Sequence, residues 1–268
     1  MPIMNLSRSV RMTVPADPGR LRNGKNTFAG TPLTSSLGAY YEFTVDYAGE
    51  EAPETGFVFS IYDIDGAVRT ALPPLLSRAI ASGAEPVALM PTLRDAITDQ
   101  LGVLPRTLRW TLNPYHELAM HEHDTTHLTL SRRYTFSASH RLSLPGLSDD
   151  ENYERFGKCS RRNGHGHNYE LVVHARVPVE PDDFDSVSLD ELITDGIIDH
   201  LDHRNLNLDV EEFINSNPTL ERITIYCHRF IEKTLADTPA TIERIEVWEN
   251  DRTSCSFPPA PVPGEATR

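Results

Sequence analysis

Alternating apolar and polar residues predict four strands in the second half of the chain. Within 134–140 and 168–177, apolar side chains occupy every second position, as is typical of antiparallel strands with one buried face. A shorter strand pair is expected at 243–250 and 255–257. The pattern therefore favours a four-stranded antiparallel sheet.

Apolar residues spaced three and four positions apart predict two helices between the strand pairs. The first begins at an S-x-x-E capping box formed by Ser188 and Glu191. Its apolar face consists of Leu189, Leu192, Ile193, Ile197 and Leu201. The second runs from 219 to 235, with an apolar face of Leu220, Ile223, Cys227, Phe230 and Ile231. The order β-β-α-α-β-β predicts an α+β unit with both helices on one face of the sheet.

The chain also repeats itself. The segment LSRSVRM near the start matches LSRRYTF from Leu130 at an offset of 124, and LGAYYEFTV matches HGHNYELVV from His165 at an offset of 128. Two further matches follow in the same order, MPTLRDAI with NPTLERIT at 127 and RWTLN with EVWEN at 137. We therefore predict two copies of one unit, residues 1–122 and 123–268.

Composition narrows the classes of partner. The chain has 268 residues, of which 39% are hydrophobic, and Lys+Arg 25 against Asp+Glu 39 gives a formal charge of −14. The share of hydrophobic residues is enough for a buried core and excludes a disordered or fibrous chain. The negative net charge disfavours nucleic acids and anionic membrane surfaces as partners. No apolar run approaches the ~18 residues that a membrane span needs, and the first residues lack the apolar segment of a secretory signal.

Three scattered cysteines are too few for a disulfide framework, so we expect a cytoplasmic protein with reduced thiols. Cys227 lies on the apolar helix face and is expected in the core. Nothing in the sequence distinguishes Cys255.

The segment HGH places two histidines on one side of an expected strand. Residues i and i+2 of a strand face the same way, so His165 and His167 can bind one ion, and His140 in the preceding strand can supply a third ligand. Three neutral imidazoles with an open position are typical of catalytic zinc. The alternative is a polar loop with solvated histidines, and the spacing alone does not decide.

The first copy lacks all three histidines. At the offsets above, they fall on Ala16, Leu37 and Ala39, although the surrounding residues persist. Their joint loss indicates that the three act as one unit. Four other polar residues of the second copy have no counterpart in the first: Cys159, Asp202, His203 and Glu249.

Five segments in order, FSASHRL, FGKCSRRNGHGHNYEL, LDHRNLN, NPTLE and VWEN, resemble the 6-pyruvoyltetrahydropterin synthase / 6-carboxytetrahydropterin synthase family. The resemblance covers about 130–257 and implies the tunnelling fold (T-fold), whose units join in rings to form wide barrels. The chain is then two tandem T-fold units, each a four-stranded antiparallel sheet with two helices on one face. Residues 1–122 match only as a degenerate copy. The family usually has Asp where this chain has Ser188.

The resemblance implies a role for each matching residue. The zinc ligands correspond to His140, His165 and His167. The catalytic cysteine and its Asp-His pair correspond to Cys159, Asp202 and His203. The glutamate that holds the pterin ring corresponds to Glu249.

Further substrate contacts are expected around the same motifs. Lys158, Arg161 and Arg162 supply local positive charge for a triphosphate near Cys159. Thr219 could contact the pterin or could simply cap the second helix.

The family implies a zinc-dependent lyase acting on 7,8-dihydroneopterin triphosphate. The family has two products. We favour 6-carboxy-5,6,7,8-tetrahydropterin, on the path to 7-deazaguanines such as queuosine, because that pathway is the commoner setting among prokaryote-like cytoplasmic chains. The alternative is 6-pyruvoyltetrahydropterin, of the tetrahydrobiopterin-type pathway. A non-catalytic pterin-binding or scaffold protein is a further alternative. It is disfavoured because pure binding needs no base.

A four-stranded unit has two unpaired edges that must be covered or closed. Since the family closes barrels with rings of three units and stacks two rings, we expect a homo-oligomer of three two-unit chains with three active sites. The first copy would then be a structural partner. Three segments are left over: the acidic loop 143–155, which has no assigned role, a histidine-rich linker at 121–127, and a Pro-rich tail from about 258 that we expect to be disordered.

Overall fold

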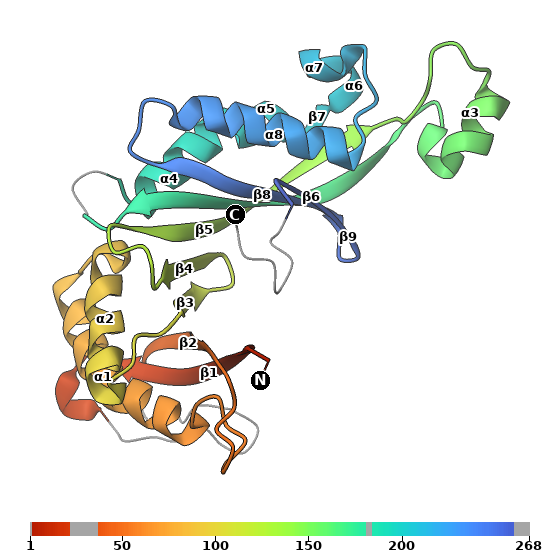
Figure 1. Ribbon diagram of the computed structural model, residues 1–268. Coiled ribbons are helices and arrows are strands. Elements are labelled where there is room, and N and C mark those ends of the chain that lie inside the picture. Colours follow the sequence, from red (N-terminus) through yellow and green to blue (C-terminus); the bar gives the residue numbers. More distant parts are fainter. Residues whose placement is uncertain (1, 22–36, 181–183, 260–268) are drawn as a thin grey trace. The chain divides into compact units, whose positions relative to one another are not determined.

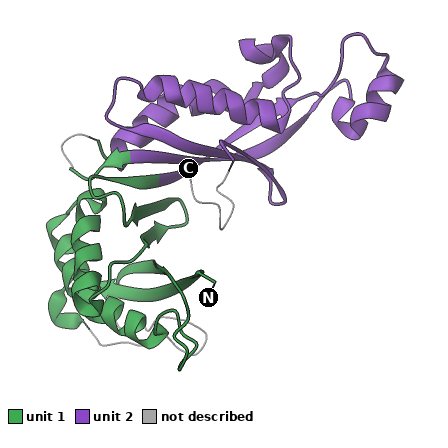
Figure 2. Cartoon of the chain, in the orientation of Figure 1, with its two compact units in different colours: residues 1–130, 177–185 green, residues 131–176, 186–268 purple. Residues whose placement is uncertain are grey.

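The computed structural model describes residues 2–21, 37–180 and 184–259. The chain forms two compact units, which Figure 2 colours separately. Unit 1 consists of residues 1–130 and 177–185, and unit 2 of residues 131–176 and 186–268. The predicted boundary between residues 122 and 123 stays a prediction.

Unit 1 contains an antiparallel sheet in the order β1-β2-β3-β4. Two helices, α1 and α2, pack on it (Figure 1), and they bury apolar residues such as Leu72, Met90 and Leu93 completely. The element bounds are β1 Met4–Pro15, the 3-10 helix η1 Pro18–Arg20, β2 Gly38–Gly49, α1 Ile61–Ser82, α2 Pro86–Leu101, β3 Thr107–Asn113 and β4 His116–His121.

Unit 2 repeats this plan with the strand order β5-β6-β8-β9, and a short strand, β7, pairs with β5. The strands are β5 His127–His140, β6 His165–Pro178, β7 Arg204–Asn205, β8 Thr241–Asn250 and β9 Thr253–Phe257. The helices are α3 Asp149–Phe156, η2 Gly157–Ser160, α4 Ser186–Ile193, η3 Thr194–Ile198, α5 Asp199–Leu201, α6 Leu206–Asp209, α7 Glu211–Ile214 and α8 Leu220–Leu235. The predicted α+β class with two similar units is confirmed.

Strand register supports the repeat in detail. Glu42 of β2 pairs with Thr111 of β3, and Glu170 of β6 pairs with Trp248 of β8. The differences, 170 − 42 = 128 and 248 − 111 = 137, are the two offsets read from the sequence. The two sheets are therefore in the same register at this strand pair.

The first helix of unit 2 differs from its prediction. It begins at Ser186, so Ser188 lies inside the first turn, and the predicted capping box of Ser188 and Glu191 is wrong. The helical backbone then continues through a π-helical segment, Thr194–Ile198, and through α5 to Leu201. A Cβ on Gly196 would lie 3.2 Å from the ring of Phe230, so glycine lets α8 pack closely here. The second predicted helix is confirmed as α8, and Cys227 is fully buried in it.

The predicted histidine-rich linker is shorter than 121–127. Its first histidine, His121, ends β4, and its last, His127, begins β5. Most of the tail, residues 260–268, lies outside the described residues. Among the described helices, none combines the length and apolarity needed to cross a bilayer.

Candidate metal and catalytic site

Three histidines of unit 2 converge where two neighbouring strands meet. His140 is the last residue of β5, and His165 and His167 lie at the start of β6. The Nε2 atoms of His140 and His165 are 3.2 Å apart, and one ligand atom from each of the three residues lies within 4.8 Å of the others. The structure therefore brings together the three residues predicted to bind zinc.

The protonation of these histidines suits a metal ion. The Nδ1 atom of His140 lies 2.8 Å from the carbonyl oxygen of Pro218, so it must carry the proton, which leaves the Nε2 lone pair facing the cluster. Burial lowers the pKa of both His140 and His165, and the neighbouring histidines lower it further. Neutral imidazoles are the form that a metal requires.

Two ring nitrogens in the cluster are buried without a hydrogen-bond partner in the described part of the chain, Nδ1 of His165 and Nε2 of His167. Buried polar atoms normally have partners. A bound cation would supply one to His167, so the donor set fits a zinc ion.

Glu249 of β8 lies against the same cluster. Its Oε1 atom is 3.5 Å from Nε2 of His167 and 3.6 Å from Nε2 of His140. A carboxylate in this place can offset the charge of a cation and can accept hydrogen bonds from a substrate. The predicted contact with the pterin ring stays a prediction.

Cys159 lies in the short helix η2, which is tied to the segment that follows His140. The backbone N–H of Leu142 donates to the carbonyl of Cys159 at 2.9 Å, and Nε of Arg141 donates to the carbonyl of Ser160 at 2.8 Å. Residues 140–142 thus connect a histidine of the cluster to the turn that carries Cys159, and we call these hydrogen-bonded segments the frame of the site. Gly164 also belongs to this frame, because it has φ 66° and a Cβ there would lie 2.7 Å from the carbonyl oxygen of His140.

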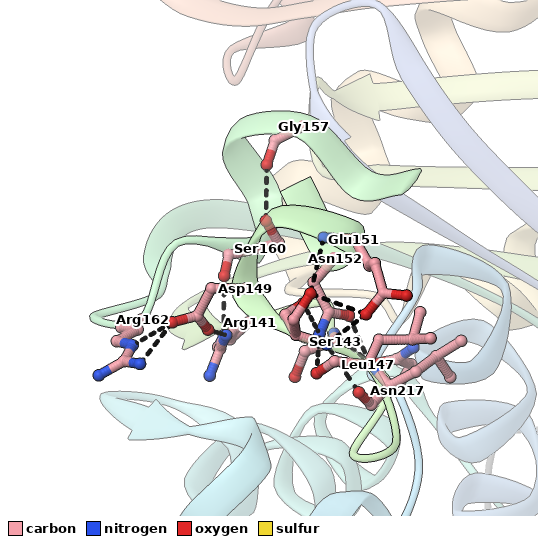
Figure 3. Close-up of polar contacts among 12 residues, drawn as sticks. Arg141, Ser143, Leu147, Asp149, Glu151, Asn152, Gly157, Ser160, Arg162 and Asn217 are labelled. Atoms are coloured by element: carbon pink, nitrogen blue, oxygen red, sulfur yellow. Dashed lines mark hydrogen bonds and ion pairs between the residues drawn. The ribbon is translucent and has the colours of Figure 1, made fainter. Parts of the chain in front are cut away.

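The acidic loop 143–155, which had no assigned role, is an ordered part of this frame (Figure 3). Ser148 and Glu151 form a complete capping box at the start of α3. The buried side chain of Asn152 accepts from the N–H of Leu144 at 2.8 Å and donates to the carbonyl of Leu147 at 3.1 Å. The loop therefore folds around one buried amide.

The three basic residues predicted near Cys159 differ in their surroundings. Nε of Arg162 donates to Asp149 at 2.6 Å, and Arg141 reaches the same carboxylate at 3.2 Å (Figure 3). The hydrogen bond from Arg162 lowers the pKa of Asp149. Lys158 and Arg161 are exposed and form no ion pair within the described residues. These two are therefore better placed for a phosphate group than Arg162 is.

Asp202 and His203 form a separate dyad at β5. The Asp202 carboxylate accepts from the N–H of Ser137 at 2.7 Å and lies 2.6 Å from Nδ1 of His203. The bond from Ser137 and then the contact with His203 lower the pKa of Asp202. His203 has φ 57°, and its side chain is 83% exposed. Within the described residues, no hydrogen bond joins this dyad to Cys159 or to the three histidines.

His203 lines a cavity of about 570 Å³ with Ser137, Ser139, Gly166, His167 and Asn168. Gly166 and Asn168 alternate along β6 with His165, His167 and Tyr169, so they face the opposite side of the sheet. The imidazole of His203, held in a backbone conformation that is rare outside glycine, is consistent with a functional role.

Thr219 precedes α8 as its N-cap residue and directly follows Pro218, whose carbonyl holds His140. Its side chain bonds to Glu221 rather than to the helix backbone, and this bond contributes to lowering the pKa of Glu221 after the backbone contribution at the helix start. Thr219 thus adjoins the residue that holds His140, and its side chain makes no capping bond to α8; its contact with the pterin stays a prediction.

The described part of unit 1 has the same four-stranded plan as unit 2 but lacks the histidine cluster. Within the described residues, the three histidines of unit 2 are the one cluster of three or more potential metal ligands. Ala16 and Leu37, which stand in for two of them, are exposed. The counterpart of Cys159, Thr31, lies outside the described residues.

One residue of the site was not identified from the sequence as functional. Tyr169 follows His167 by two positions on β6, so strand alternation alone places it on the same face as the histidines. Its ring lies 5.6 Å from that of His167 and 6.3 Å from that of His140.

Comparisons with known proteins concern the part of the chain that carries this site. The family model for 6-pyruvoyl tetrahydropterin synthase matches residues 129–260. The human 6-pyruvoyl tetrahydrobiopterin synthase is 38% identical over 125 residues, which are 46% of this chain and 85% of that protein. The Drosophila melanogaster enzyme of the same name is 39% identical over 131 residues, 48% of this chain and 77% of that protein. The structure of Caenorhabditis elegans 6-pyruvoyl tetrahydropterin synthase is 34% identical and covers 49% of this chain and 94% of that one, with a TM-score of 0.45.

Proposed function

Because the chain belongs to the 6-pyruvoyl tetrahydropterin synthase family, we propose that unit 2 is a zinc-dependent lyase acting on 7,8-dihydroneopterin triphosphate. The observation that carries the proposal is the convergence of three histidines, with Glu249 3.5 Å from one of them. A binding or scaffold protein of the same fold would have no need of a metal cluster beside a tethered cysteine.

In this proposal His140, His165 and His167 hold the ion. Zinc, when bound, polarises the side-chain oxygens of the substrate and makes the adjacent C–H bonds more acidic. The carbonyl of Pro218 keeps His140 in the tautomer that presents Nε2. Glu249 would accept hydrogen bonds from the N–H groups of the pterin ring and so hold the ring beside the histidines.

Cys159 and His203 are proposed to move the protons. Cys159 removes a proton from a side-chain carbon, and Arg141 and Leu142 hold its turn in position beside the histidines. Asp202 bonds Nδ1 of His203, which leaves Nε2 available as a second proton carrier. Since His203 is exposed and the dyad has no bond to Cys159 in the described part of its own chain, we propose that the dyad serves the cysteine of a neighbouring chain.

We propose 6-pyruvoyltetrahydropterin as the product, because the relatives named above are 6-pyruvoyl synthases. The 6-carboxy product favoured on the sequence is not supported by these relatives and stays a prediction. Incubating the purified, zinc-loaded protein with dihydroneopterin triphosphate, followed by mass spectrometry of the pterins, distinguishes the two. Release of triphosphate with a 6-pyruvoyl product supports the proposal, a 6-carboxy product corrects it, and unchanged substrate would refute it.

We further propose that three chains assemble into the six-unit ring system expected of the family. Light scattering should then give about three times 30.1 kDa. A stable monomer would show that the exposed dyad has no neighbouring chain to serve.

A further inference from the structure

Tyr169 is the most completely buried aromatic side chain near the histidine cluster. Its relative exposure is 0%, and its ring stacks on Phe136 at 4.9 Å with an interplanar angle of 13°. The rings of His140 and His167 make edge contacts with it at 6.3 and 5.6 Å. The phenol ring is therefore packed against three other rings.

The hydroxyl of this ring has no hydrogen-bond partner among the described residues. Leaving a buried donor unpaired is costly, so such groups are rare in structures and need an explanation. Tyr169 follows His167 by two positions on β6, and Oε1 of Glu249 lies 3.5 Å from Nε2 of the same histidine. The ring that carries this O–H donor thus contacts two imidazoles, one of which lies beside a carboxylate, and the donor has no acceptor of its own among the described residues.

We propose that the Tyr169 hydroxyl donates a hydrogen bond to a side-chain oxygen of the substrate when that oxygen becomes anionic during proton abstraction. The inference rests on the proposed function of the site. The proton stays on the tyrosine, and the bond forms only where negative charge develops, so the interaction strengthens from the ground state to the transition state.

The burial of Tyr169 argues against a purely structural role. If packing alone selected this residue, phenylalanine would fill the same space beside Phe136 without an unpaired hydroxyl. The oxygen atom therefore costs stability in the free protein and is explained by a partner that arrives with the substrate.

The chain supplies a matched control. Tyr41 of unit 1 stands at the offset of 128 from Tyr169, and its ring packs edge-on against Trp110 at 5.1 Å, away from any described metal-binding cluster. Tyr41→Phe removes the same atom from the same place in the repeat but from the unit without the chemistry.

The experiment compares Tyr169→Phe, Tyr41→Phe and the unaltered full-length protein. For Tyr169→Phe we expect kcat to fall by about 100-fold, with KM and zinc content little changed and the thermal midpoint equal or higher. Tyr41→Phe should leave kcat unchanged. The combination of lower turnover with undiminished stability is one that a packing role does not produce.

Other outcomes overturn the inference. An unchanged kcat in Tyr169→Phe refutes it, provided that the unaltered protein turns over. A raised KM at unchanged kcat would show that the hydroxyl serves Glu249 and ring binding instead, and a lower thermal midpoint would show a structural hydrogen bond. If the unaltered protein fails to convert the substrate, the proposed function fails first, and the two failures are thereby separated.

Discussion

Unit 1 and unit 2 hold the first strand against the first helix with the same ion pair, although among the described residues only unit 2 has the histidine cluster. In unit 1, Arg8 bonds Asp65 at 2.8 Å. In unit 2, Nε of Arg132 bonds Asp190 at 2.8 Å, and Tyr134 donates to the same carboxylate at 2.7 Å. The ion pair between strand and helix is present in both units, whereas the histidine cluster is described in one. The fold of a unit therefore does not depend on the histidines.

A second equivalent contact shows where the two units diverged. Ser7 bonds Asp46 in unit 1, and Ser131 bonds Nδ1 of His174 at 2.8 Å in unit 2. The offsets, 131 − 7 = 124 and 174 − 46 = 128, are those of the repeat. An arginine completes each contact, Arg109 on the aspartate and Arg244 on the histidine. The same position therefore carries a charged acceptor in one unit and a neutral imidazole in the other.

The largest effect should come from removing a metal ligand. We expect His165→Ala to reduce zinc from about one per chain to near none and turnover to background, because the remaining two histidines cannot hold the ion tightly. Metal analysis of a preparation made without chelators measures the first, and the pterin assay measures the second. His123→Ala, in an exposed turn, should change neither. Two zinc ions per chain would mean that unit 1 has a site after all.

The next largest effect should come from the cysteine. Cys159→Ala should keep the zinc and the fold while turnover falls by ~10²-fold or more, as expected for the loss of a general base. Cys255→Ala, which removes the other partly exposed thiol of unit 2, serves as the control. Undiminished turnover would transfer the base role to His203 and leave Cys159 as a residue of the frame alone.

A smaller loss is expected at the dyad. Asp202→Asn removes the charged acceptor from Nδ1 of His203 and should lower turnover by roughly 10-fold or more at neutral pH. The exposed Asp195→Asn is the matched control. If mixing Asp202→Asn with Cys159→Ala chains restored part of the activity, the two residues would have to act from different chains. Absence of any restoration in mixed oligomers would place them in one chain.

The smallest effect concerns the pH dependence of stability at His174, the residue of unit 2 that stands where unit 1 has Asp46. Burial, followed by the charge of Arg244, lowers the pKa of His174 to about 4, against about 6.5 in an unfolded chain. Between these values the unfolded state binds the extra proton, so unit 2 loses stability as the pH falls from 6.5 towards 4, by up to about 3 kcal/mol.

Thermal unfolding followed across this pH range tests the difference. His174→Gln, which can accept from Arg244 without titrating, should flatten the profile of unit 2. An equally steep acid loss in that variant would assign the pH dependence to other groups.

Much of the fold could be predicted from the sequence because strand and helix periods survive duplication. The offsets of 128 and 137 read from the sequence are also the offsets between the paired residues Glu42–Thr111 and Glu170–Trp248. Helix α8 lies where its apolar spacing predicted it. The S-x-x-E motif was less reliable. At Ser148 it forms both cap bonds, whereas at Ser188 the same pattern lies inside a helix. A local motif does not decide between the two, because tertiary contacts such as Arg132 with Asp190 fix where the helix lies.

The site was predictable to the extent that its residues are close in sequence. Strand alternation paired His165 with His167, His140 was added from the end of the preceding strand, and the structure brings the three together. The unpaired hydroxyl of Tyr169 could not be predicted, because burial and lack of a partner are properties of the packed site. The distance between Glu249 and the histidines likewise depends on the pairing of β6 with β8.

The hydrogen-bonded loop around Asn152 has a consequence for the affinity of the ion. Residues 141–164 connect two of the ligands, and a flexible connection of these 24 residues would lose about 3 kcal/mol of loop-closure entropy when an ion joined its ends. Here the loop is already closed by the bonds of Asn152, Asp149 and Arg141 (Figure 3). A segment that contributes no ligand would thereby tighten metal binding by up to roughly a hundredfold, through an ordering step completed before the ion arrives.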